Sequence, residues 1–88
     1  MSEPTIIDVR DPEKYAARHV KGAQSLPHTQ ILAGEKPDLP KDAPIVTYCG
    51  SGNKAKRMKA ELQKLGFTNV ESTSLPKLEK DGKEVESS

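Results

Sequence analysis

The chain has 88 residues, a length that supports one small domain with a modest hydrophobic core. Its 14 basic and 13 acidic side chains give a formal net charge of +1, which does not favour nucleic acid or anionic membranes as partners. One cysteine excludes an internal disulfide, and no apolar run is long enough to span a bilayer. Residues 1–4 lack the features of a secretory signal, which predicts a cytoplasmic location; the alternative is a periplasmic location after removal of a signal peptide.

The first part of the chain predicts short strands and helices in alternation. Residues 5–9 are mostly apolar and β-branched, and they predict a buried strand. Residues 11–13 read Asp-Pro-Glu, which is typical of a helix start, and this helix is expected to end near Arg18. A brief second strand is predicted over residues 24–26, followed by one or two helical turns over residues 28–32.

The second part of the chain contains the clearest elements. Residues 34–44 are rich in proline and predict a surface loop, and the apolar residues 45–48 predict a buried strand. A helix is expected from Lys54, and Gly66 is suited to end it in a left-handed conformation. Residues 68–70 predict a further short strand. The apolar face of the helix is formed by residues at helical spacing: Ala55, Met58, Leu62 and Leu65.

Alternating strands and helices predict an α/β domain with a parallel sheet. We expect residues 1–78 to form this domain, with Leu75 and Leu78 docked on its core, and residues 79–88 to form a flexible polar tail. Ligands of parallel sheets bind at the carboxyl ends of the strands. Two polar segments fall at such ends, residues 8–10 and residues 49–53.

The second of these segments contains the cysteine. Cys49 follows a predicted strand, and Gly50 and Gly52 allow the next residues to curl into a turn before the helix. Amide N–H groups of such a turn can point into one concavity and bind an anion, and the positive end of the helix dipole adds to this effect. We therefore expect the thiolate form of Cys49 to be stabilised.

Four cations lie in the first two turns of the predicted helix: Lys54, Lys56, Arg57 and Lys59. Cations there oppose the helix dipole at a cost of about 0.3–1 kcal/mol each, which is understandable if an anion occupies the site. A lone cysteine is usually a small buried hydrophobe, and a basic helix face is usually only solvated. The coincidence of thiol, glycine-rich turn and cations within residues 49–59 favours a functional cysteine.

Several stretches resemble the rhodanese-like domain family in order and spacing. The motifs IDVR (7–10), EKY (13–15), HVKGA (19–23) and LP (26–27) resemble its opening signature. Residues 46–55 are similar to its active-site loop, and residues 65–70 to the helix end and strand that follow. The resemblance implies a small three-layer α/β domain with helices on both faces of the central parallel sheet.

The resemblance also implies sulfurtransferase chemistry. Cys49 as a thiolate would take the outer sulfur of thiosulfate or another donor, become a persulfide, and pass the sulfur to cyanide or a thiol acceptor. Asp8 and Arg10 would be framework residues near the site. No cofactor or metal is implied, and we expect a monomer that binds neither nucleic acid nor membrane. The substrate-binding loop would comprise Gly50, Ser51, Gly52, Asn53, Lys54 and Ala55.

The chain departs from the family pattern at several positions. Asn53 and Lys54 stand where family loops often carry an arginine, and a lysine lacks the bidentate guanidinium fork, so weaker thiosulfate binding is expected. Arg18 replaces a common glycine, and residues 72–75 lack the paired glycines and tryptophan of many members. Two further hypotheses therefore stay open: a persulfide carrier that delivers sulfur to a protein partner, and an inactive domain that senses anions.

Three other functions are disfavoured. Related phosphatases need an arginine at the sixth position after the cysteine, where this chain has Ala55, and the first arginine is Arg57. A Cys–His protease needs a histidine base, but we interpret His19 as a framework residue and His28 as a loop residue. One cysteine and two scattered histidines have no metal-ligand spacing.

Overall fold

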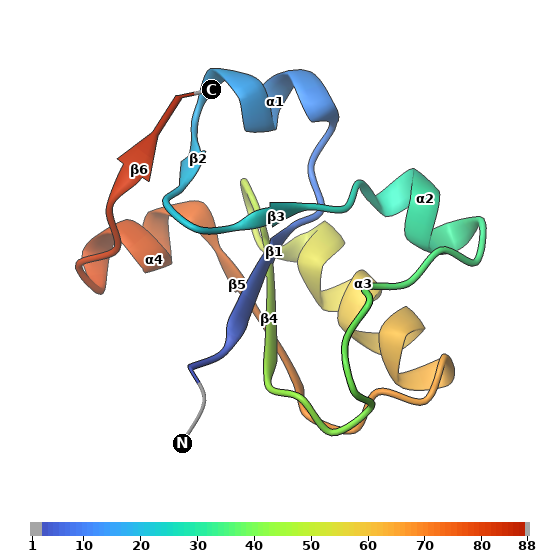
Figure 1. Cartoon of the computed structure of the whole chain (residues 1–88). Helices are drawn as coiled ribbons and strands as arrows, with labels where there is room; N and C mark the ends of the chain where they lie inside the picture. The colour runs from blue at the N-terminus through green and yellow to red at the C-terminus, as the bar shows by residue number, and fades with distance from the viewer. Residues whose placement is uncertain (1–2, 88) are drawn as a thin grey trace.

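Four parallel strands form the centre of the protein, which is known from a computed structural model that describes residues 3–87. The strands are β1 (Thr5–Asp8), β3 (Gln24–Ser25), β4 (Ile45–Cys49) and β5 (Val70–Ser74), in the spatial order β3-β1-β4-β5 (Figure 1). In the register of the sheet, Thr47 lies between Ile7 of β1 and Ser72 of β5. The predicted parallel sheet is confirmed, and β4 lies inside it because its apolar side chains are covered on both faces.

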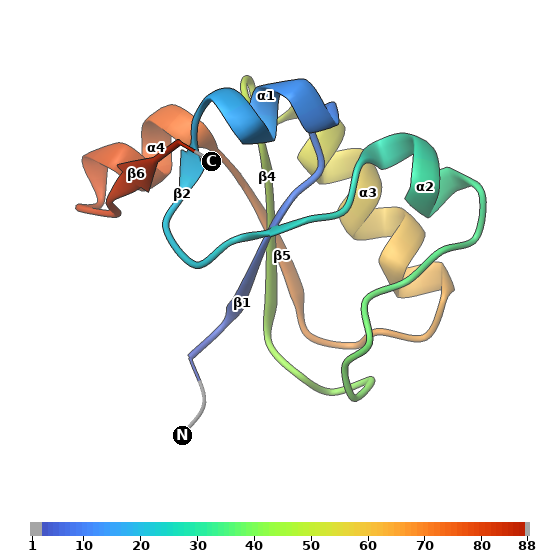
Figure 2. The same ribbon diagram turned by 45° about the horizontal axis from the view of Figure 1, so that its top comes forward.

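Helices cover both faces of this sheet. Figures 1 and 2 show α2 (His28–Leu32) and α3 (Asn53–Lys64) on one face and α4 (Leu75–Lys80) on the other. A fourth helix, α1 (Pro12–Ala17), lies near the carboxyl ends of β1 and β4 in both views. The predicted three-layer α/β architecture is thereby confirmed, and the carboxyl ends of the strands meet below α1.

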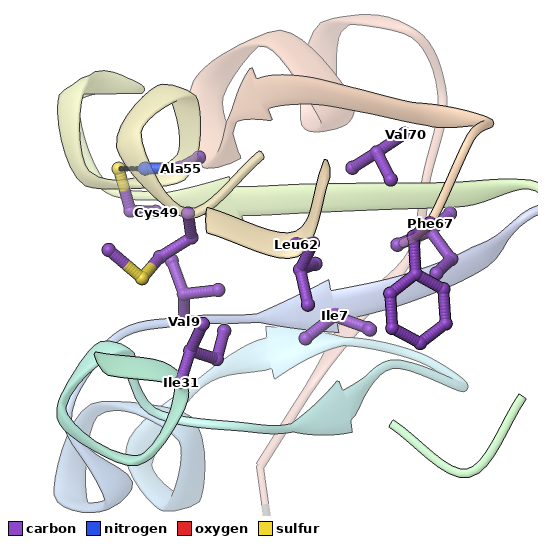
Figure 3. Close-up of a cluster of buried hydrophobic side chains, with 10 residues drawn as sticks. Ile7, Val9, Ile31, Cys49, Ala55, Leu62, Phe67 and Val70 are labelled. Carbon is purple, nitrogen blue, oxygen red and sulfur yellow. Dashed lines mark hydrogen bonds between the residues drawn. The ribbon is translucent and has the colours of Figure 1, made fainter. Parts of the chain in front are cut away.

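Two hydrophobic clusters hold the layers together. The larger cluster lies between the sheet and helices α2 and α3 (Figure 3) and contains Ile7, Val9, Ile31, Ile45, Cys49, Ala55, Met58, Leu62, Phe67 and Val70. The smaller lies on the α4 side and contains Val20, Ala23, Tyr48, Leu75 and Leu78. Because successive side chains of a strand point to opposite faces, Tyr48 and Cys49 enter different clusters. The thiol therefore faces α3, whereas the phenol faces α4.

Several element boundaries differ from the sequence prediction, most of them by one residue, and two of the differences lie next to the cysteine. Helix α3 begins at Asn53 with Gly52 as its N-cap, one residue before the predicted start. Strand β5 begins at Val70, where the predicted strand ended, and continues to Ser74. It is an edge strand that pairs with β4 alone, and four of its five residues are polar. Its pairing is dictated by the neighbouring strand, so no hydrophobic alternation marks it in the sequence.

The C-terminal segment also differs from the prediction of a domain end at residue 78. Helix α4 runs to Lys80, and β6 (Val85–Glu86) pairs antiparallel with β2 (His19–Val20). Strands of two residues carry no sequence periodicity, which explains why they were not predicted. Residues 1, 2 and 88, which belong to the predicted N-terminal start and C-terminal tail, lie outside the described range. Within residues 3–87, no helix has the length and apolar character needed to cross a membrane.

Candidate active site

Cys49 is the last residue of β4 and begins the turn into α3. The residue pairs with Ser74 at the carboxyl end of β5, so it is held by the sheet rather than by a free loop. Gly52 then adopts a left-handed φ of +93°, which a residue with a Cβ atom rarely adopts, and serves as the N-cap of α3. Its carbonyl accepts the Lys56 N–H at 3.0 Å, which closes the first helical turn. The predicted glycine-dependent turn therefore lies directly after the cysteine. Residues 49–55 are called the cysteine loop below.

Backbone amides of the cysteine loop surround the sulfur. The Gly52 N–H donates to Cys49 Sγ at an N···S distance of 3.0 Å. The Ala55 N–H donates to the same sulfur at 3.4 Å, and Figure 3 shows this second bond. The Asn53 N–H points instead to Ser51 Oγ at 3.4 Å. Two amides at the start of a helix thus face the sulfur, and they stabilise negative charge on it through hydrogen bonds and the helix dipole.

A pocket of about 390 Å³ opens next to the sulfur. Cys49 itself is only 2% exposed, whereas Gly50 and Ser51 at the tip of the loop are exposed. The pocket therefore has a buried thiol in its wall and an accessible rim. Eight residues line it: Arg10, Asp11, Lys14, Cys49, Gly50, Ser51, Asn53 and Lys54. Five of these were predicted site residues of the cysteine loop, and the other three come from the segment after β1.

The framework residues predicted near the site form a buried network, called the carboxylate network below. Asp8 is fully buried and accepts hydrogen bonds from Arg10 Nη2 at 2.6 Å, Arg10 Nε at 3.0 Å and Tyr48 OH at 2.9 Å. The Tyr48 oxygen in turn accepts the Val20 N–H at 3.0 Å. The hydrogen bonds to Asp8 raise the pKa of Arg10, and burial raises the pKa of Tyr48 to about 12. At neutral pH the network therefore contains one ion pair and a neutral phenol.

Thr47 supports the cysteine loop from below and was not predicted from the sequence. It is fully buried in β4, and its hydroxyl donates to the Ala55 carbonyl oxygen at 2.9 Å. This bond ties the first turn of α3 to the sheet and so helps to position the Ala55 N–H against the sulfur. The one sign of it in the sequence is a hydroxyl residue inside the apolar run of residues 45–48.

Other residues considered in the sequence lie away from the thiol. The His19 ring contacts the Tyr15 carbonyl oxygen at 2.7 Å and Glu86 at 3.2 Å, and the His28 ring contacts the Val9 carbonyl oxygen at 3.1 Å. No hydrogen bond joins a histidine to Cys49 in the described part of the chain. Of the four cations at the start of α3, only Lys54 lines the pocket. Residues 3–87 contain no group of three or more histidine, cysteine, aspartate or glutamate side chains able to hold a metal ion.

Known proteins resemble this chain in sequence and in fold. A family model described as the rhodanese-like domain matches residues 1–73. The thiosulfate sulfurtransferase PspE of Escherichia coli is 36% identical over 69 residues, which cover 75% of this chain and 64% of that protein. The probable adenylyltransferase/sulfurtransferase MoeZ of Mycobacterium tuberculosis is 38% identical over 66 residues, which cover 74% of this chain and 17% of that protein.

A solved structure agrees over nearly the full length. The structure described as rhodanese with anions from E. coli superposes with a TM-score of 0.80 at 29% identity, covering 98% of this chain and 100% of that chain. The chain spans less than two thirds of the two curated relatives, so they support the family and not the whole activity of either protein. The family model, in contrast, covers most of this sequence. The chain therefore belongs to the rhodanese-like domain family.

Proposed function

We propose that the protein is a sulfurtransferase that carries sulfane sulfur as a persulfide on Cys49, with thiosulfate as the donor. The observation that carries this proposal is the pair of amide donors from Gly52 and Ala55 on Cys49 Sγ, beside an open pocket. A reactive cysteine needs its thiolate form stabilised and its sulfur within reach of a substrate. The name of PspE as a thiosulfate sulfurtransferase supports the same donor.

The reaction divides into two displacements at sulfur. In the first, the Cys49 thiolate attacks the outer sulfur of thiosulfate, an S–S bond to the enzyme forms, and sulfite leaves with the electron pair of the broken S–S bond. In the second, cyanide or a thiolate attacks the outer sulfur of the persulfide, and the Cys49 thiolate is released. Each step conserves charge and needs no added oxidant or reductant. The sulfur bound to the enzyme carries negative charge in both steps, as the Cys49 thiolate or as the persulfide. The amides of the cysteine loop stabilise this charge.

The pocket has the size and composition for a small anion. Its volume of about 390 Å³ lies near the lower end of the usual range for ligand sites of about 300–1,000 Å³. Ser51, Asn53 and Lys54 are among the residues that line it, and hydroxyl, amide and ammonium groups suit sulfonate oxygens. The E. coli rhodanese structure described with anions supports the same interpretation.

A persulfide carrier that delivers sulfur to a protein partner is the second candidate. The observation that favours it is the exposure of Gly50 and Ser51 at the rim, which leaves the pocket accessible to a protein-bound acceptor. A Cys-x5-Arg phosphatase is disfavoured by the position of Ala55. Its side chain is fully buried in the core, so no arginine could take that place and reach the pocket without rebuilding the first turn of α3.

Mass spectrometry of the intact protein tests the proposal. Incubation with thiosulfate should add the mass of one sulfur atom, and cyanide should then remove it and release thiocyanate. The matched variant Cys49→Ser should show neither change, since a serine hydroxyl does not form the persulfide. Loading by thiosulfate with little thiocyanate release would favour the carrier. An unmodified wild-type mass after incubation with thiosulfate would contradict the proposed donor.

A further inference from the structure

The segment that follows β1 lines the pocket together with the cysteine loop. Asp11, the residue before α1, and Lys14 in its first turn both line the pocket with Cys49. In the sequence, Asp11 predicts only a helix start, and Lys14 lies in the EKY stretch (13–15) of the family signature. They bring one negative and one positive charge to the mouth of a site whose proposed substrate is an anion.

The effect of Asp11 and Lys14 on the electrostatic potential at the thiol depends on the other charges that line the pocket. Arg10 also lines it, but its guanidinium is paired with the buried carboxylate of Asp8. Lys14 and Lys54, in contrast, take part in no ion pair within residues 3–87. The Asp11 side chain makes no capping hydrogen bond to α1. The uncompensated charges around the thiol are therefore two ammonium groups and one carboxylate.

Helix α1 is anchored so that Lys14 stays on the pocket side. Arg10 Nη2 donates to the Arg18 carbonyl oxygen at the end of α1. Tyr15, the neighbour of Lys14, donates from its hydroxyl to the Ala23 carbonyl oxygen at 2.7 Å, and its ring stacks on His19 at a centroid distance of 3.9 Å. These contacts fix the backbone that carries Lys14, while its own side chain remains exposed.

We propose that Lys14 is a specificity-determining residue that favours anionic sulfur donors, and that Asp11 opposes it. The proposal rests on the proposed sulfur transfer at Cys49 and adds a residue pair outside the cysteine loop. Thiosulfate carries two negative charges toward a thiolate, so three negative charges approach one another in the transition state. A cation that lines the pocket lowers the resulting repulsion, and a carboxylate that lines it raises the repulsion.

Alkylation of Cys49 by two reagents of similar size isolates this electrostatic effect. Iodoacetate is an anion, whereas iodoacetamide is neutral, and both react with the same thiolate. Any change in the amount or nucleophilicity of the thiolate alters both rates and cancels in their ratio. The ratio of the iodoacetate rate to the iodoacetamide rate therefore reports the potential at the pocket, without depending on sulfur transfer.

The variants give effects of opposite sign. Lys14→Gln keeps a long side chain and should lower the ratio about two- to fivefold, and Asp11→Asn should raise it by a similar factor. Both shifts should shrink at high salt, since the groups are near the surface. The matched control is Lys36→Gln, in the loop before β4 at the other end of the sheet, which removes the same charge and should leave the ratio unchanged.

Steady-state kinetics with thiosulfate completes the test. Lys14→Gln should raise KM for thiosulfate by about two- to tenfold and change kcat less, because the charge acts on an approaching anion. Equal alkylation ratios in wild type, Lys14→Gln and Asp11→Asn would overturn the inference even if thiosulfate loads Cys49. Shifted ratios in a protein that thiosulfate does not load would instead support the charge assignment and contradict the proposed donor.

Discussion

The carboxylate network and the cysteine loop lie at adjacent strand ends but are built from different groups. Asp8, Arg10 and Tyr48 hold one another through side chains, and Asp8 is fully buried. The cysteine loop holds its sulfur through backbone amides of Gly52 and Ala55. In the first region the identity of each side chain matters, whereas in the second the backbone conformation matters.

Because of this difference, we expect the carboxylate network to determine mainly the stability of the fold and the cysteine loop to determine mainly the reactivity of the thiol. The carboxylate network joins β1 to β4 and, through the Arg18 carbonyl oxygen, to α1, so it supports the walls of the pocket. The cysteine loop leaves its side chains at the rim free to vary, because the amides that face the sulfur belong to every residue type except proline. Substitutions in the network should therefore change the free energy of unfolding. Substitutions of the uncharged residues at the rim of the loop should change reactivity only where they alter the backbone.

The largest effect is expected for Asp8→Asn. The variant removes the partner of the Arg10 guanidinium and places an amide NH₂ group among donors, which should lower the free energy of unfolding by about 3–5 kcal/mol. That is a large part of the total stability of a small domain. Urea unfolding measures it. The matched control Asp42→Asn, in the exposed loop before β4, should change stability by less than about 0.5 kcal/mol. Equal effects of the two variants would contradict the structural role of the network.

A smaller effect is expected for Tyr48→Phe. The variant leaves the Val20 N–H without its acceptor and Asp8 with one donor fewer, at a cost of about 1–3 kcal/mol at neutral pH. The control Tyr15→Phe removes one hydroxyl bond to a backbone carbonyl in a less buried place and should cost about 0.5–1.5 kcal/mol. Thermal and urea unfolding of both variants should rank them in this order.

The same tyrosine predicts a pH dependence. Its pKa in the folded protein is about 12 against an ordinary value of 10.0, so the unfolded chain loses the proton first as pH rises. The stabilising contribution of the neutral phenol is complete below pH 10 and is lost between pH 10 and pH 12. The stability difference between wild type and Tyr48→Phe should therefore narrow over this interval. A difference that stays constant up to pH 12 would contradict the burial of an un-ionised phenol.

Much of the fold was predictable because apolar runs and helical spacing in the sequence mark its longer elements. The apolar run of β4 and the helical spacing of Ala55, Met58 and Leu62 predicted the elements on both sides of the site. Strand β5 was misplaced because it is a polar edge strand. Strands β2 and β6 were missed because they are short and pair only with each other, across most of the chain. Their positions depend on pairing with distant segments, which local patterns do not encode.

The candidate site was predictable to the same extent. Cys49, Gly50 and Gly52 lie within four residues, so their spacing alone predicts a turn that brings backbone amides to the sulfur. The contribution of Thr47 depends on a hydrogen bond to Ala55 that appears only when α3 is packed on the sheet. The approach of Lys14 to the pocket depends on where α1 lies relative to a segment far along the chain. Such juxtapositions are products of tertiary structure and have no local signature.

Two separate glycine-to-alanine variants in the cysteine loop test the comparison between the two regions most directly. Gly52 has a φ of +93°, and an added Cβ would meet Ser74 Cβ at 3.7 Å, which is an ordinary contact. The cost of Gly52→Ala should therefore come from the backbone, at about 1–2 kcal/mol. Gly50 does not have a positive φ, and an added Cβ there meets no atom within 4 Å, so Gly50→Ala should cost less than about 0.5 kcal/mol.

Reactivity should separate the same two variants. Relief of strain in Gly52→Ala moves the Gly52 N–H away from Cys49 Sγ and should slow thiosulfate loading roughly tenfold, because an amide aimed at developing charge is lost. Gly50→Ala leaves both amide donors in place and should load at close to the wild-type rate. The rate is followed by intact mass over time after addition of thiosulfate. Equal slowing of loading in Gly50→Ala and Gly52→Ala would mean that the open space beside Gly50 is needed for thiosulfate to reach the sulfur. In that case the backbone amides would not be the feature that distinguishes the loop from the carboxylate network.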